Sequence, residues 1–181
     1  QIAENAGVTD QIEFRLVQPG PLPMPNQSFD LVFSKDSMIH IPDKAAIYTE
    51  IFRVLCPGGQ AAFSDWFGSE MPSTPEFEEW LNVVGLTFGM GTLTEAERLM
   101  AEIGFQEIAT NDRNEWYAGY MQQELAALQG EHYDRLVSTH GAELAAQRLQ
   151  SSSAKKVVVD QGLLRPGHIR ATKPRLNQGR I

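Results

Sequence analysis

The segment from Phe29 to Trp66 constrains the fold more than any other part of this 181-residue chain. Residues 29–34 form a mostly apolar run with the length of a strand that is buried on both faces. Residues 42–55 place apolar side chains at helical spacing, and a second apolar run at residues 60–66 follows the break Pro57-Gly58-Gly59. Two such strands joined by a helix predict a parallel pair with a right-handed crossover, which is typical of α/β architecture.

Further elements are expected on both sides of this unit. Polar and apolar residues alternate in a short stretch near the start of the chain, as they do in a strand. Thr94 and Glu97 have the spacing of a helix capping box, so a helix is expected to start at Thr94. The other expected elements are strands at 12–17, 105–109 and 168–173, a helix after Pro75, and a helical region over 114–150 that breaks near Gly130 and Gly141 and is followed by a serine linker at 151–153.

Composition limits the class of protein. Hydrophobic residues make up 42% of the chain and charged residues 21%, which is near the average of globular proteins. The net charge of −8 argues against nucleic acid as a partner, and no apolar run approaches the ~20 residues that span a bilayer. The single Cys56 cannot form an internal disulfide. We therefore expect a soluble, cytoplasmic protein that binds neither nucleic acid nor membrane.

Three short motifs, in this order and spacing, resemble the class I S-adenosylmethionine-dependent methyltransferases. The first is Leu22-Pro23 with Ser28-Phe29-Asp30-Leu31-Val32 shortly after it, the second is Arg53-Val54-Leu55-Cys56-Pro57-Gly58-Gly59, and the third is Ile103-Gly104-Phe105. The resemblance covers roughly residues 3–110. It implies an α/β fold with a partial Rossmann-like sheet (strands 3–7 of the family) and added C-terminal helices. A single domain, 1–181, is expected, with a helical insertion at 111–162 that covers the active site.

A narrower resemblance lies within the first one. The block Ser34-Lys35-Asp36-Ser37-Met38-Ile39-His40-Ile41 and the C-terminal stretch 167–174 are similar to phosphoethanolamine methyltransferases and to their relatives that methylate sarcosine and dimethylglycine. Those enzymes use S-adenosylmethionine and need no metal. The resemblance therefore implies S-adenosylmethionine as the cofactor and a small amine as the substrate.

The catalytic residues that this resemblance implies are His40 and Asp36. Methyl transfer to an amine requires an unprotonated nitrogen that is held in line with the methyl group, so positioning supplies most of the acceleration. An imidazole can accept the ammonium proton, and a carboxylate is the natural counter-charge for the amine. The structural alternatives are a hydrogen bond from His40 next to a helix and capping of the chain by Asp36.

Four residues are expected to contact the cofactor: Gln18, Pro19, Ser34 and Lys35. Gln18 stands where the family has an aspartate facing the adenine, and its amide oxygen can still accept that hydrogen bond. Lys35 replaces a more usual arginine and lacks the planar fork of a guanidinium.

Three residues are expected at the substrate: Trp66, Trp80 and Lys155. A methylated ammonium binds well to an indole face, although core packing explains the two tryptophans equally well. Val84 and Leu86 occupy the positions of the arginine and tyrosine that bind phosphate in the family. This difference favours glycine, sarcosine or dimethylglycine as the acceptor over a phosphobase.

The resemblance also implies that the chain starts after the family's second strand. The glycine-rich loop and the acidic residue that hold much of the cofactor would then lie before Gln1. In the family strand order 3-2-1-4-5-7-6, the strand at 29–34 would have an open apolar edge. We expect this edge to be covered by residues 12–17, by a second copy in a homodimer, or by another polypeptide.

Two other functions remain open at this point. The first is a non-catalytic fragment that serves in oligomerisation or partner binding, which the changes at Gln18 and Lys35 favour. The second is a nicotinamide-dependent oxidoreductase, which also has a parallel sheet but leaves the block 34–41 unexplained.

Overall fold

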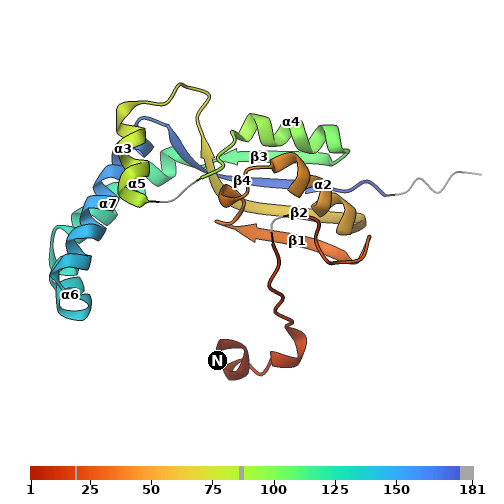
Figure 1. Cartoon of the computed structure of the whole chain (residues 1–181), viewed down its shortest axis with the longest axis horizontal. Helices are drawn as coiled ribbons and strands as arrows, with labels where there is room; N and C mark the ends of the chain where they lie inside the picture. The colour runs from red at the N-terminus through yellow and green to blue at the C-terminus, as the bar shows by residue number, and fades with distance from the viewer. Residues whose placement is uncertain (19, 86–87, 176–181) are drawn as a thin grey trace, which may run out of the picture.

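A four-stranded sheet forms the centre of the computed structural model, which describes residues 1–18, 20–85 and 88–175 (Figure 1). The strand order is β1-β2-β4-β3, with β1 and β2 parallel and β4 antiparallel to both of its neighbours. The strands are β1 (Phe29–Lys35), β2 (Leu55–Gly68), β3 (Gln106–Asp112) and β4 (Leu164–Thr172). Helix α2 (Lys44–Val54) joins the parallel pair, which confirms the expected α/β crossover.

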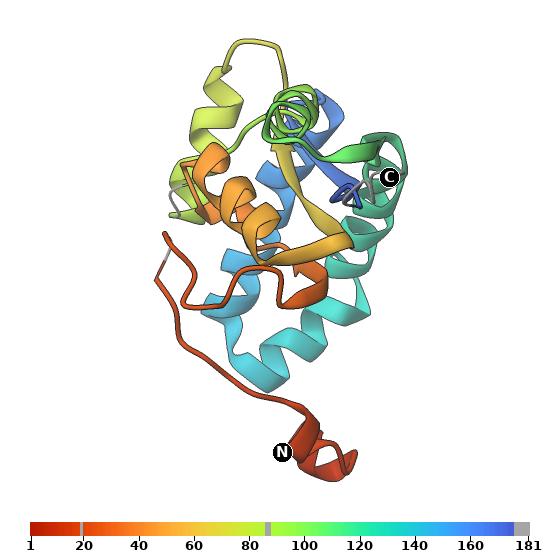
Figure 2. The same ribbon diagram turned by 90° about the vertical axis from the view of Figure 1, so that its right-hand side faces the viewer.

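One face of the sheet packs against α2 and α4 (Leu93–Ile103), as Figure 2 shows from the side. The side chains between these layers include a stacked Tyr48–Phe63 pair with ring centroids 5.9 Å apart. Helix α4 starts two residues earlier than expected, because Thr92 rather than Thr94 is its N-cap and accepts a hydrogen bond from the Glu95 N–H at 3.1 Å. The core residues of this layer include Tyr48, Ile51, Leu55, Phe63, Met100, Phe105 and Ile169.

Four further helices gather beyond the carboxyl ends of β1 and β2 (Figure 1). The breaks expected near Gly130 and Gly141 are confirmed, but the serine linker is wrong. Residues 151–153 lie inside a helix, because the Ser153 hydroxyl donates to the Leu149 carbonyl within that helix and Ser152 is buried. These helices are α3 (Pro75–Val84), α5 (Asn114–Leu128), α6 (Glu131–His140) and α7 (Ala142–Asp160).

The N-terminal part of the chain differs from the expectation. After α1 (Ile2–Asn5) and a short 3-10 helix η1 (Thr9–Gln11), residues 12–18 have no regular structure and run away from the sheet (Figures 1 and 2). Phe14 is 88% exposed and Leu16 97% exposed. The expected strand at 12–17 is therefore wrong: alternation predicts a strand only where a neighbouring strand edge pairs with it.

Strand β1 lies at the edge of the sheet, with β2 as its hydrogen-bonded neighbour. Leu31 is 55% exposed and Phe33 is 66% exposed. Within the described residues, this edge is not paired with residues 12–17, so that first expected way of covering the edge is wrong.

No helix in the described part of the chain has both the length and the apolar character that crossing a membrane requires.

Candidate active site

The turn that follows β1 is held by hydrogen bonds to Asp65, a buried residue near the end of β2. Its Oδ2 accepts hydrogen bonds from the backbone N–H groups of Ser37 at 3.1 Å and Met38 at 2.6 Å. Its Oδ1 accepts from the N–H of Ile39 at 3.3 Å and of Trp66 at 2.8 Å. Because a charged acceptor strengthens such bonds, one carboxylate fixes the segment between Asp36 and His40.

Lys44 holds the same turn through its carbonyl groups. Its Nζ donates to the carbonyl oxygens of Met38 and, at 2.6 Å, Ile41. Burial lowers the pKa of Lys44, and the nearby carboxylates of Asp65 and Glu95 oppose that shift. Sequence reasoning did not assign Asp65 and Lys44 this role; the available signal was a carboxylate inside an apolar strand.

Asp36 occupies an unusual backbone conformation. Its φ is +52°, which is uncommon for a residue other than glycine, and its N–H donates to the Ser64 carbonyl at 2.9 Å. The side chain is half exposed, with a carboxylate oxygen 4.0 Å from Lys35 Nζ. Such conformations persist where the surrounding structure imposes them, and they cluster at functional sites.

Asp36 and His40 open into a cavity of about 390 Å³ at the carboxyl edge of the parallel strands. Parallel sheets commonly bind ligands at this edge. Five of the residues expected at the site line this cavity: Asp36, His40, Trp66, Trp80 and Lys155.

The residues expected to hold the cofactor are not part of this lining. Ser34 and Lys35 lie at the carboxyl end of β1, next to Asp36. Gln18 is exposed on the extended N-terminal segment, and Pro19 lies outside the described residues. The described residues therefore fit only part of S-adenosylmethionine, at the end of β1.

One wall of the cavity combines two aromatic rings with a lysine. The rings of Trp66 and Tyr117 meet edge to face with centroids 4.9 Å apart. Lys155 Nζ lies 3.9 Å from the centroid of the Trp66 ring and 5.0 Å from that of Tyr117. Burial lowers the pKa of Lys155 to about 8, helped by Arg148 and opposed by Glu124 and Asp36. Burial also raises the pKa of Tyr117, so its phenol stays neutral.

Helices α5 and α7 supply a polar group to the cavity that sequence reasoning missed. Glu124 Oε1 lies 3.5 Å from Arg148 Nη2 and accepts a hydrogen bond from the Ser152 hydroxyl at 3.3 Å. No local sequence signal joins these residues, because they meet only after two helices pack together.

The opposite wall depends on a glycine. The Gly89 N–H donates to the Ile39 carbonyl at 2.8 Å, and a Cβ atom at Gly89 would lie 2.6 Å from Pro42 Cα. This close approach brings Phe88 to the site, with its ring centroid 5.5 Å from both His40 and Trp80. Gly89 therefore serves this close packing.

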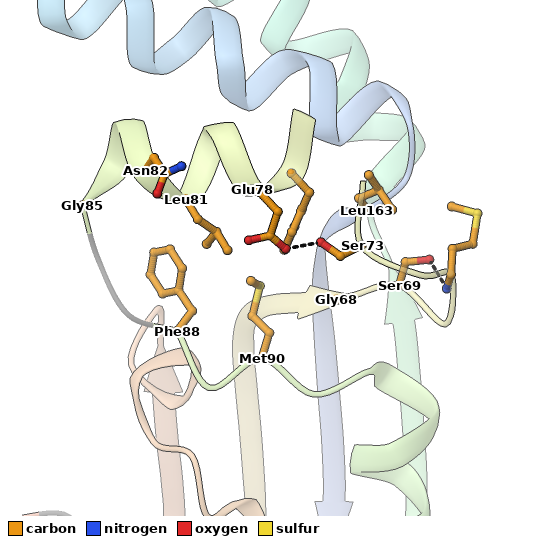
Figure 3. Close-up of a pocket in the computed structure, with 12 residues that line it drawn as sticks. Gly68, Ser69, Ser73, Glu78, Leu81, Asn82, Gly85, Phe88, Met90 and Leu163 are labelled. Atoms are coloured by element: carbon orange, nitrogen blue, oxygen red, sulfur yellow. Dashed lines mark hydrogen bonds between the residues drawn. The ribbon is translucent and has the colours of Figure 1, made fainter. Parts of the chain in front are cut away.

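A second cavity of about 670 Å³ lies on the other side of Phe88, between α3 and the end of β2 (Figure 3). Its lining mixes apolar and polar side chains, and the polar ones include Glu78, which accepts a hydrogen bond from the Ser73 hydroxyl. None of the residues expected at the active site lines this cavity, so the cavity that holds Asp36 and His40 is the better candidate.

Comparison with known proteins shows a likeness to methyltransferases. A family model described as a methyltransferase domain matches residues 1–63. Phosphoethanolamine N-methyltransferase 1 of Arabidopsis thaliana is 26% identical over 125 residues, which are 69% of this chain and 25% of that protein.

Two solved structures share the fold. A structure assigned to a sarcosine dimethylglycine methyltransferase of Galdieria sulphuraria has a TM-score of 0.80 at 22% identity, covering 96% of this chain and 63% of that chain. Phosphoethanolamine N-methyltransferase 2 of Haemonchus contortus, in complex with phosphomonomethylethanolamine and S-adenosylhomocysteine, has a TM-score of 0.76 at 18% identity, covering 84% of this chain and 35% of that chain.

The chain therefore has the fold of the class I S-adenosylmethionine-dependent methyltransferases, in the strand order expected for family strands 4-5-7-6. Within that class, it resembles the phosphoethanolamine N-methyltransferases and the sarcosine dimethylglycine methyltransferases. It spans about a quarter of the length of the curated phosphoethanolamine N-methyltransferases it matches.

Proposed function

We propose that this chain supplies the substrate side of an S-adenosylmethionine-dependent methyltransferase that acts on a small amine. The observation that carries this proposal is the cavity in which Asp36, His40 and Trp66 meet at the carboxyl edge of the parallel strands. S-adenosylmethionine, when bound, supplies an electrophilic methyl group, and Ser34 and Lys35 are the described residues that would lie along it.

The side chains of the cavity have complementary roles in this proposal. Asp36 provides the counter-charge that draws an ammonium group into the cavity, and His40 accepts the proton that the nitrogen must lose. The Trp66 face orients a methylated nitrogen. The hydrogen bonds of Asp65 and Lys44 to the turn after β1, here called the clamp, keep Asp36 and His40 at a fixed separation. An in-line reaction requires such fixed positions. The helices within 111–162 carry Tyr117 and Lys155, so they form the wall that contains these two side chains, and they limit the entry of water.

The acceptor that we propose is of the glycine, sarcosine or dimethylglycine type. Val84 lines the cavity at the position where the resemblance implies a phosphate-binding arginine, and an aliphatic side chain cannot bind phosphate. Leu86, at the corresponding tyrosine position, lies outside the described residues. The Galdieria sulphuraria structure, described as acting on sarcosine and dimethylglycine, supports this choice.

Calorimetric titration of the 181-residue chain with S-adenosylmethionine and S-adenosylhomocysteine tests the proposal. We expect weak binding by this chain alone, because its described residues fit only part of the cofactor, and methyl transfer to at least one of glycine, sarcosine and dimethylglycine. Absence of binding at millimolar ligand would show that this chain alone is not a methyltransferase.

The open edge of β1 favours a second candidate function, a module that binds a second copy of itself. An antiparallel arrangement with Val32 opposite Val32 of the second copy would place Leu31 opposite Phe33 of that copy. Both exposed apolar side chains would then be covered in one two-fold interface. We propose a homodimer through this edge as the alternative to catalysis by a single chain.

The double substitution Leu31→Lys and Phe33→Lys tests the dimer. We expect sedimentation velocity to find the parent chain as a dimer and the variant as a monomer, because two charges on each edge strand oppose pairing. Thr110→Lys on β3, at the other edge of the sheet, is the matched control and should leave the dimer intact. A monomeric parent chain at high micromolar concentration would contradict the proposal.

A further inference from the structure

The aromatic pair of Trp66 and Tyr117 already holds a cation that belongs to the chain itself. Lys155 Nζ, at 3.9 Å and 5.0 Å from the two ring centroids, lies within the range of cation–π attraction to both. Lys155 comes from α7, whereas Trp66 comes from β2 and Tyr117 from α5. The contact therefore joins three elements at the wall where an amine is expected to bind.

We propose that Lys155 is a built-in competitor for the aromatic pair, which a plain cation must displace before it can bind there. This inference rests on the proposed function only for its substrate class, a small amine. Lys155 thereby becomes a specificity-determining residue. A simple ammonium ion can contact the ring faces only if it displaces the like-charged ammonium group of Lys155. An acceptor with a carboxylate next to its amine can instead form an ion pair with Lys155 away from the rings.

The charges around Lys155 show why its position is adjustable. Glu124 on α5 and Asp36 after β1 attract it, and Arg148 on its own helix repels it. Glu124 is already paired with Arg148 and Ser152, so it is not free to hold Lys155. His40 and the neutral phenol of Tyr117 also face the cavity. Burial destabilises the protonated form of Lys155 and lowers its pKa to about 8, so the Lys155 ammonium group loses its charge as the pH rises through that value.

Binding of tetramethylammonium, measured without any cofactor, tests this inference. The probe is titrated into ¹⁵N-labelled chain while the indole N–H signal of Trp66, assigned with Trp66→Phe, is followed. We expect Lys155→Met to bind the probe about tenfold more tightly than the parent chain at pH 7. Lys156→Met, which changes the neighbouring lysine paired with Asp160, is the matched control and should bind like the parent chain.

Two further measurements separate charge from space. Raising the pH from 7 to 9 should strengthen binding to the parent chain more than binding to Lys155→Met, because only the parent chain carries the Lys155 ammonium group, whose pKa is about 8. A neutral probe of nearly the same shape, 2,2-dimethyl-1-propanol, should gain less affinity from Lys155→Met than tetramethylammonium does, because it meets no like charge at Lys155. The inference is overturned if Lys155→Met binds tetramethylammonium no more tightly than the parent chain does. It is also overturned if the substitution strengthens binding of the neutral probe as much as binding of the cation. Neither result depends on methyl transfer, so failure here is distinct from failure of the proposed function.

Discussion

Replacing Asp65 by alanine is expected to destabilise the chain by on the order of 4 kcal/mol in the free energy of unfolding. The substitution removes the acceptor for four backbone N–H groups, those of Ser37, Met38, Ile39 and Trp66. Buried donors without a partner lose their hydration without compensation, which costs more than the net gain from making a hydrogen bond. Urea unfolding followed by circular dichroism measures the change.

Asp65→Asn separates shape from charge in this experiment. The amide keeps one acceptor oxygen but presents an NH₂ group to backbone donors, so we expect an intermediate loss of stability. Asp30→Ala, which removes an exposed carboxylate from β1, is the matched control and should change stability by less than about 0.5 kcal/mol. If Asp65→Ala unfolds at the same urea concentration as Asp30→Ala, the clamp does not hold the turn.

Replacing His40 by alanine is expected to lower kcat for amine methylation by about 10²–10⁴-fold, the range that a positioned proton acceptor contributes. Binding of the cofactor should change little, because His40 is not one of the residues that would lie along it. Transfer of a labelled methyl group from S-adenosylmethionine to sarcosine and dimethylglycine measures the effect.

The fold should survive this change, since His40 is exposed to solvent. His168→Ala removes an exposed histidine from β4 and should retain the parent rate. A rate for His40→Ala within threefold of that control would remove His40 from the proton-transfer role and leave Asp36 as the candidate. A lowered melting temperature in His40→Ala alone would instead indicate the structural role of this histidine.

Local sequence patterns determined most of the secondary structure. The apolar run at 29–34, the helical spacing that follows it and the second apolar run at 60–66 predicted the parallel pair β1–β2, which the structure contains. The motifs behind the family resemblance also have a local physical basis. Arg53 of the second motif donates to the carbonyls of Leu22 at 2.9 Å and Met24 at 2.8 Å, so it ties the first motif to α2.

The candidate site was only partly readable from the sequence. Asp36, His40, Trp66, Trp80 and Lys155 were expected there, and they line one cavity. Their chemical roles stay predictions until the variants are measured. The resemblance could indicate Asp36 and His40 because they lie in a motif that follows the end of β1. It could not indicate that Lys155 rests on Trp66 and Tyr117, because no periodic pattern relates a residue on α7 to one on β2.

Tertiary structure alone decided the remaining features, and the physical reason is the same for each of them. Periodicity and capping residues specify an element over a few neighbouring residues, whereas strand pairing and helix packing join residues far apart in the chain. Residues 12–17 have the alternation of a strand, yet no strand edge in the described part of the chain pairs with them. Asp65 reads as the end of a strand, yet it organises a turn 26–28 residues away. The sequence by itself determined most of the helices and strands, and only their packing decided which side chains meet.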